Sequence, residues 1–311
     1  MLNKPAELLN PGSHISLPNS FENMLLHWPE LKPLLESFAN QDPGTFMHSV
    51  AVHFTANRLT QDLFLLLKPN LTTQNEIFNR SPFWMLHDIG KTAASTDKET
   101  AQTLVHPYHL LERPAYDKAR HWIHPQMGAD LLTIWAKNTA PNLQPLVKKW
   151  AQLTCLHDRQ LNPFLDCNSE NLAVIDKLSL LIFSLADTSM AMGLPRPNKN
   201  STSSTDEVRH ALHRKYLQDN TLIELFPQQN LNQLRHYIVT SVLHSLQELK
   251  KNYPESVWIK PSGFSNQSFK FLVDPNSEKT KILDDLVVQT WQENESIWEK
   301  IMVEMDLERV F

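Results

Sequence analysis

The sequence contains little glycine, little cysteine and no long apolar run, and each of these shortages excludes a class of protein. Glycine supplies 6 of the 311 residues and proline supplies 20, which favours helices separated by proline-marked breaks over a glycine-rich β architecture. No run of about 18 apolar residues occurs, so we expect no transmembrane helix. The N-terminus is not followed by an apolar segment of signal-peptide length either, and we therefore expect a cytoplasmic protein.

The cysteine content and the net charge narrow the choice further. Cys155 and Cys167 are too few for a disulfide framework and lack the spacing of a metal site, so we expect two reduced thiols. The formal net charge of −5 argues against a general electrostatic grip on nucleic acid, although a local basic patch stays open. Apolar residues make up 41% of the chain and charged residues 20%, which is typical of a globular protein.

Apolar residues recur at helical spacing along most of the chain and predict a mainly α-helical fold. Helices are expected at 45–67, 74–87, 116–123, 125–138, 143–157, 172–192, 206–217 and 231–251. We divide the chain into a lead-in with short helices (1–40), a central domain (41–200) and a C-terminal helical region of unknown role (206–311). The C-terminal region could include a small β-hairpin at 257–260 and 269–273.

The segment His87-Asp88-Ile89-Gly90-Lys91 follows an apolar run and is the main functional signal in the sequence. A histidine and an aspartate side by side can ligate one metal site, because a carboxylate can bridge two ions. The glycine allows the backbone to bend or to approach another segment closely. The lysine places a cation where an anionic phosphate would sit.

Further candidate metal ligands lie on both sides of this segment, at His48, His124, His157 and Asp187. Asp187 is the most informative of them, because it interrupts the apolar run 180–186. An ionised carboxylate on such a helix is costly to bury unless it is paired or bound to metal. The alternative is an acid at a helix end that meets solvent or a lysine.

In this order the segments resemble the HD superfamily of metal-dependent phosphohydrolases, and most closely its HD-GYP branch. The family's HDIGK signature is matched in full by residues 87–91, and its His-Pro-x-x-Gly motif by residues 124–128. Its opening histidine is similar to His48, and its late apolar helix ending in Ala-Asp is similar to residues 186–187. The resemblance covers residues 44–197. The branch's His-His-Glu and Gly-Tyr-Pro motifs are replaced by Leu156-His157-Asp158 and the residues after it, which argues against a third metal and against recognition of cyclic di-GMP.

The resemblance implies an HD-type helical bundle over 41–200 that hydrolyses a nucleotide-like phosphoester, such as a cyclic nucleotide or dinucleotide, with a metal-bridging hydroxide. It implies one ion on His48, His87, Asp88 and Asp187, and a second ion on Asp88, His124 and His157. Iron or manganese suits these ligands best. Asp88 and Lys91 would be catalytic, Lys91 would also contact the substrate, and Arg159 and Arg196 are candidates for a further phosphate contact or ordinary surface residues.

Two other functions stay open. A nucleotide phosphomonoesterase or a nuclease-like enzyme would use the same metal ligands, although the acidic net charge weighs against a nuclease. A degenerate HD domain that serves as a ligand sensor or interaction scaffold would need no pair of ions. Residues 206–311 could pack on the central domain, form a homodimer surface or bind a protein partner.

Overall fold

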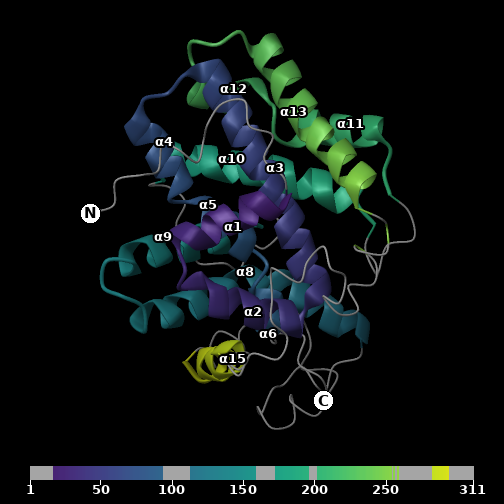
Figure 1. Ribbon diagram of the computed structural model, residues 1–311. Coiled ribbons are helices and arrows are strands. Elements are labelled where there is room, and N and C mark those ends of the chain that lie inside the picture. The colour runs from purple at the N-terminus through teal and green to yellow at the C-terminus, as the bar shows by residue number, and fades with distance from the viewer. Residues whose placement is uncertain are drawn as a thin grey trace. The chain divides into compact units, whose positions relative to one another are not determined.

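The computed structural model of the protein describes residues 17–93, 113–158, 172–195, 202–253, 255, 258 and 282–293. Of these residues 82% are helical and none lies in a strand, so the prediction of a mainly helical protein is confirmed (Figure 1). The expected hairpin lies outside the described residues, apart from Trp258. No helix in the described ranges has both the length and the apolar character needed to cross a membrane.

The chain forms two compact units, and each is assembled from separate stretches of sequence. The first consists of residues 1–29, 43–85 and 170–273, and the second of residues 30–42, 86–169 and 274–311. This grouping concerns packing and does not test the functional division into 1–40, 41–200 and 206–311, which stays a prediction.

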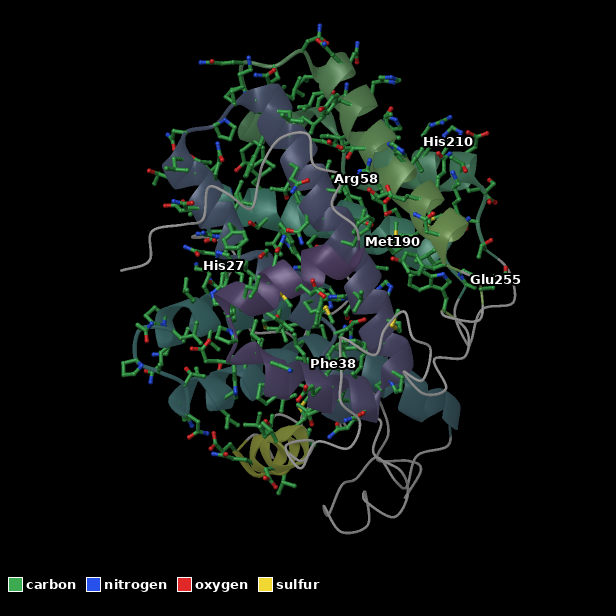
Figure 2. All side chains as sticks on the ribbon, in the orientation of Figure 1. His27, Phe38, Arg58, Met190, His210 and Glu255 are labelled. Atoms are coloured by element: carbon green, nitrogen blue, oxygen red, sulfur yellow. The ribbon has the colours of Figure 1, made fainter. Side chains whose placement is uncertain are left out.

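The first unit is built around one long helix, α3 (Pro43–Leu67). Against it pack α1 (Leu17–His27), α10 (Val174–Gly193) and α13 (Leu231–Asn252) (Figure 1). The side chains of Phe46, Val50 and Phe54 are buried along α3, as the apolar spacing predicts. Arg58 joins α3 to α13 through an ion pair with Glu248 (Figure 2).

Among the described residues, the first unit also contains four shorter helices. They are α4 (Leu71–Phe78), α5 (Ser81–Leu86, whose last residue belongs to the second unit), α11 (Thr205–Lys215) and α12 (Asp219–Leu225). Helix α11 begins at a capping box in which Ser204 and Glu207 satisfy each other's backbone N–H groups. Helices α4, α11 and α12 all pack on α10, so the helix that carries Asp187 is covered from several sides.

The second unit is an antiparallel pair of helices with smaller helices packed on it. The pair consists of α8 (Arg113–Lys137) and α9 (Gln144–Leu156), which lie side by side (Figure 1). The short α6 (Gly90–Ala93) and the C-terminal α15 (Ile282–Glu293) both pack on α8, and α2 (Leu31–Gln41) packs on α15. Leu283 of α15 donates its backbone N–H to Ser37 Oγ of α2 at 3.2 Å.

Two predicted helix boundaries are wrong. The helix predicted at 74–87 is interrupted at residues 79–80 and forms α4 and α5, while the helices predicted at 116–123 and 125–138 form the single helix α8. Helix α8 contains Pro125 in its interior. A proline there costs one backbone hydrogen bond, and the packing of α8 against α9 and α6 outweighs that local cost.

The expectation of two reduced thiols is also wrong. Cys155 lies in the last turn of α9 and is disulfide-bonded, and no described cysteine is free. Two cysteines are too few for a framework, but they are enough for one bridge. Cys167 lies outside the described residues.

Candidate metal centre

The two motif glycines form a contact between backbones. A Cβ atom added at Gly90 would lie 2.0 Å from the carbonyl oxygen of His124 and 2.5 Å from the backbone nitrogen of Gly128. Real Cβ atoms do not approach other atoms so closely, so α6 can lie against α8 only because residue 90 is glycine. The close backbone approach expected at this glycine is confirmed.

Gly128 extends the same packing to α9. A Cβ atom at Gly128 would lie 2.8 Å from Thr154 Cγ2. The glycines of both motifs therefore hold α6, α8 and α9 together, although the two motifs are far apart in sequence. Asp88 precedes α6, His124 lies on α8 and His157 follows α9, so this packing brings the three side chains together.

The side chains of Asp88, His124 and His157 converge on one point. His124 Nε2 lies 3.1 Å from Asp88 Oδ1 and 3.0 Å from His157 Nε2, and His157 Nε2 lies 3.7 Å from Asp88 Oδ1. The exposed fraction of each side chain is at most 3%. Two ligand atoms about 2.1 Å from one ion are separated by about 3.0 Å at right angles and about 3.4 Å in a tetrahedron. The donor types and their spacing thus fit a divalent metal ion, and the group is one that could hold such an ion.

The backbone around the group fixes the orientation of His157. Its Nδ1 lies 2.5 Å from the carbonyl oxygen of Thr154, and a carbonyl oxygen can only accept a hydrogen bond. A proton therefore sits on Nδ1, and Nε2 is the ring nitrogen that faces Asp88 and His124. Metal-binding histidines are commonly held in this way by a hydrogen bond from the second ring nitrogen.

The surroundings of Asp88 and His124 keep these two ligands in the protonation states that metal binding needs. Burial alone would raise the pKa of Asp88, but the cation of Lys91 and the neighbouring His87, with hydrogen bonds from His124 and His157, hold that pKa well below its usual value. Lys91 Nζ donates to Asp88 Oδ2 at 2.6 Å. Burial, assisted by Lys91, lowers the pKa of His124 to about 4. At neutral pH Asp88 is therefore an anion and His124 is neutral.

The first unit contains a second part of the predicted ligand set. His48 on α3 and Asp187 on α10 lie opposite each other, and His48 Nε2 is 2.8 Å from Asp187 Oδ1. Asp187 lies within α10 and has a histidine partner, so it is not the helix-end acid of the alternative interpretation. His87, the remaining predicted ligand, belongs to the second unit and is almost completely buried.

Two sequence candidates and two further histidines remain to be placed. Arg159 and Arg196 lie outside the described residues. His53 is buried, and burial lowers its pKa to about 3. Its ring contacts Ser20 and Asn57, so it fastens α1 to α3 and is not a metal ligand. His210 projects from the exposed side of α11 (Figure 2).

Sequence reasoning missed Asp158. Its Oδ2 lies 3.5 Å from His124 Nε2 and 3.8 Å from His157 Nε2. Burial would lower the pKa of His157, but the carboxylates of Asp158 and Asp88 outweigh it and raise that pKa. A signal was present in the sequence, because residues 157–158 are a second His-Asp pair like residues 87–88.

In comparisons with protein-family models, curated proteins and solved structures, nothing matches the chain.

Proposed function

We propose that the protein is an HD-type, metal-dependent phosphohydrolase that hydrolyses a nucleotide-like phosphoester, such as a cyclic nucleotide or dinucleotide. The observation that carries the proposal is the convergence of Asp88, His124 and His157, with Lys91 bound to the same aspartate. A carboxylate, two imidazoles and a nearby cation together provide ligands for a divalent ion and a partner for a phosphate oxygen.

The proposal includes two ions. Asp88, His124 and His157 would hold one ion, while the assignment of the other to His48, His87, Asp88 and Asp187 rests on the resemblance. The close pair of His48 and Asp187 supports half of that assignment. Divalent ions in such a site polarise a phosphoryl group and lower the pKa of a bound water. Ligand sets of histidine and carboxylate without thiolate favour iron or manganese.

The residues of the chain itself would position the substrate and neutralise its charge. The side chain of Lys91 is 21% exposed while that of Asp88 is 3% exposed, so the lysine is the member of the pair that a phosphate could reach from solvent. Its cation would bind a phosphate oxygen and stabilise the negative charge that develops during hydrolysis. The contact of Gly90 with the α8 backbone fixes the distance between Asp88 and His124.

A cytoplasmic location would suit a nucleotide-like substrate. The disulfide at Cys155 weighs against that location, because disulfides are rare in the cytosol. Alkylation of thiols in freshly lysed cells tests the location. In a cytosolic protein Cys155 would be a free thiol and would be modified without prior reduction, whereas a disulfide-bonded Cys155 would react only after reduction.

Metal content and hydrolysis measured side by side test the function. We expect about two ions per chain by elemental analysis of anaerobically purified protein, together with metal-dependent hydrolysis of bis(p-nitrophenyl) phosphate. Asp88→Asn should lose the two ions and the hydrolysis, whereas the matched Asp285→Asn on the exposed side of α15 should keep the ions and the hydrolysis. Wild-type protein that takes up neither iron nor manganese would refute the proposal and leave the sensor or scaffold. Retention of both ions by Asp88→Asn would refute the bridging role.

A further inference from the structure

Asp158 is distant in sequence from the motifs at residues 87–91 and 124–128, yet its side chain lies beside the ligand group of Asp88, His124 and His157. It directly follows His157 after the end of α9. Its Oδ2 lies 3.5 Å and 3.8 Å from the two histidine Nε2 atoms, and Asp88 Oδ1 lies 3.1 Å and 3.7 Å from the same two atoms. The two carboxylates therefore approach the same pair of nitrogens at comparable distances.

The direction of this approach distinguishes a metal ligand from a carboxylate that only orients a histidine. An orienting carboxylate binds the ring nitrogen that points away from the metal. In His157 that nitrogen is Nδ1, and it already donates to the carbonyl oxygen of Thr154. Asp158 faces Nε2 instead, on the side of the ring where Asp88 and His124 lie.

The charge of the site also favours a second carboxylate. A divalent ion and Lys91 bring three positive charges to a buried position where Asp88 supplies one negative charge. Uncompensated charge in such a position is costly. The side chain of Asp158 is 22% exposed, so it is the solvent-facing member of the group and can adjust to an ion without disturbing the core.

We propose that Asp158 is a fourth protein ligand of the ion held by Asp88, His124 and His157. This inference rests on the proposed function, because it requires that the group holds an ion. Leu156 and Asp158 flank the ligand His157. Leu156 is apolar and buried, so of these two neighbours only Asp158 can supply a ligand. Such a 2-His, 2-Asp site binds a hard divalent ion such as Mn²⁺.

The test is titration of the metal-free full-length protein with Mn²⁺, followed by calorimetry, and with Co²⁺, followed by visible absorption. In Asp158→Asn we expect one of the two Mn²⁺ dissociation constants to rise by at least about tenfold while the other is unchanged. The Co²⁺ spectrum should change in shape, because one oxygen ligand is lost. Asp285→Asn removes the same charge from the surface of α15 and should leave both readouts as in wild type.

Asp158→Glu guards against a variant that fails to fold. It keeps the carboxylate, so Mn²⁺ binding should recover while the Co²⁺ spectrum stays distinct from wild type. Wild-type constants and an unchanged Co²⁺ spectrum in either variant would overturn the role of Asp158 and leave the proposed function standing. Failure of the wild-type protein to bind either ion would overturn both proposals, so the two failures are separated by which protein shows them.

Discussion

Asp130 on α8 carries a half-buried carboxyl group that should weaken the fold at neutral pH. Gln126 donates to its Oδ1 at 2.9 Å, while its Oδ2 has no hydrogen bond to the described protein residues. Burial raises the pKa of Asp130 to about 6, and the negative charge of Glu293 on α15 adds to the rise. Ionisation of Asp130 therefore opposes the packing of α15 on α8.

The size of the effect follows from the pKa difference. The pKa rises from 3.8 to about 6, and at about 1.4 kcal/mol per unit this corresponds to about 3 kcal/mol. Because the folded protein binds the proton more tightly, the contribution of Asp130 to stability is greatest below pH 3.8 and declines as the pH rises to 6. Asp130→Asn removes the charge but buries an amide N–H group, which subtracts about 1 kcal/mol. We expect a net gain of about 2 kcal/mol above pH 6.

Thermal unfolding of wild type and Asp130→Asn at pH 8 and pH 4.5 measures this gain. At pH 8 the unfolding midpoint should rise by about 4–8 °C, and at pH 4.5 the two midpoints should nearly coincide. Asp285→Asn removes an exposed charge from α15 and should show no such dependence on pH. An equal shift at both pH values, or a lower midpoint at pH 8, would refute the reasoning.

Three further substitutions test other parts of the structure. Gly90→Ala should lower the free energy of unfolding by about 3 kcal/mol or more, because the added Cβ meets backbone atoms, and an unchanged urea midpoint would contradict the contact. Lys91→Ala should preserve metal content but lower kcat/KM on bis(p-nitrophenyl) phosphate by about 10²–10³. The same variant should lose its metal at a higher pH than wild type when acidified, because Asp88 loses the cation that lowers its pKa. Unchanged kinetics would remove the lysine from the mechanism. Arg80→Met should lower the free energy of unfolding by about 3–5 kcal/mol, because it leaves the buried Asp176 without the donor at 2.5 Å. The double variant with Asp176→Asn should recover part of this loss in urea unfolding. Additive losses would contradict the pairing.

The sequence predicts most of the helices because helices depend on local pattern, whereas it predicts the ligand set through the resemblance. The apolar spacing along 45–67 is carried by residues that are buried in α3, so periodicity alone locates that helix. His124 and Asp88 could be paired from the sequence only through the resemblance. The structure supplies the physical reason in the contact of Gly90 with Gly128, which joins the two motifs.

The features that the sequence did not reveal depend on contacts between distant segments. Pro125 predicts a helix boundary, and only the packing of α8 on its neighbours shows why the helix continues through it. Asp158 forms a second His-Asp pair with His157 in the sequence, but its proximity to His124 depends on how α9 ends beside α8. The raised pKa of Asp130 likewise depends on Glu293, which is distant in sequence.

The C-terminal third of the chain supports the helices that carry the candidate ligands. In the first unit, α11 and α13 pack on α10, which carries Asp187, and α13 also packs on α3, which carries His48. A Cβ at Gly193 would lie 2.4 Å from Leu246 Cδ2 of α13, so α10 and α13 are in close contact there. In the second unit, α15 packs on α8, which carries His124. Residues after 205 bury apolar faces of these three ligand-bearing helices. We therefore infer that the main role of residues 206–311 is to support the helices that carry the ligands.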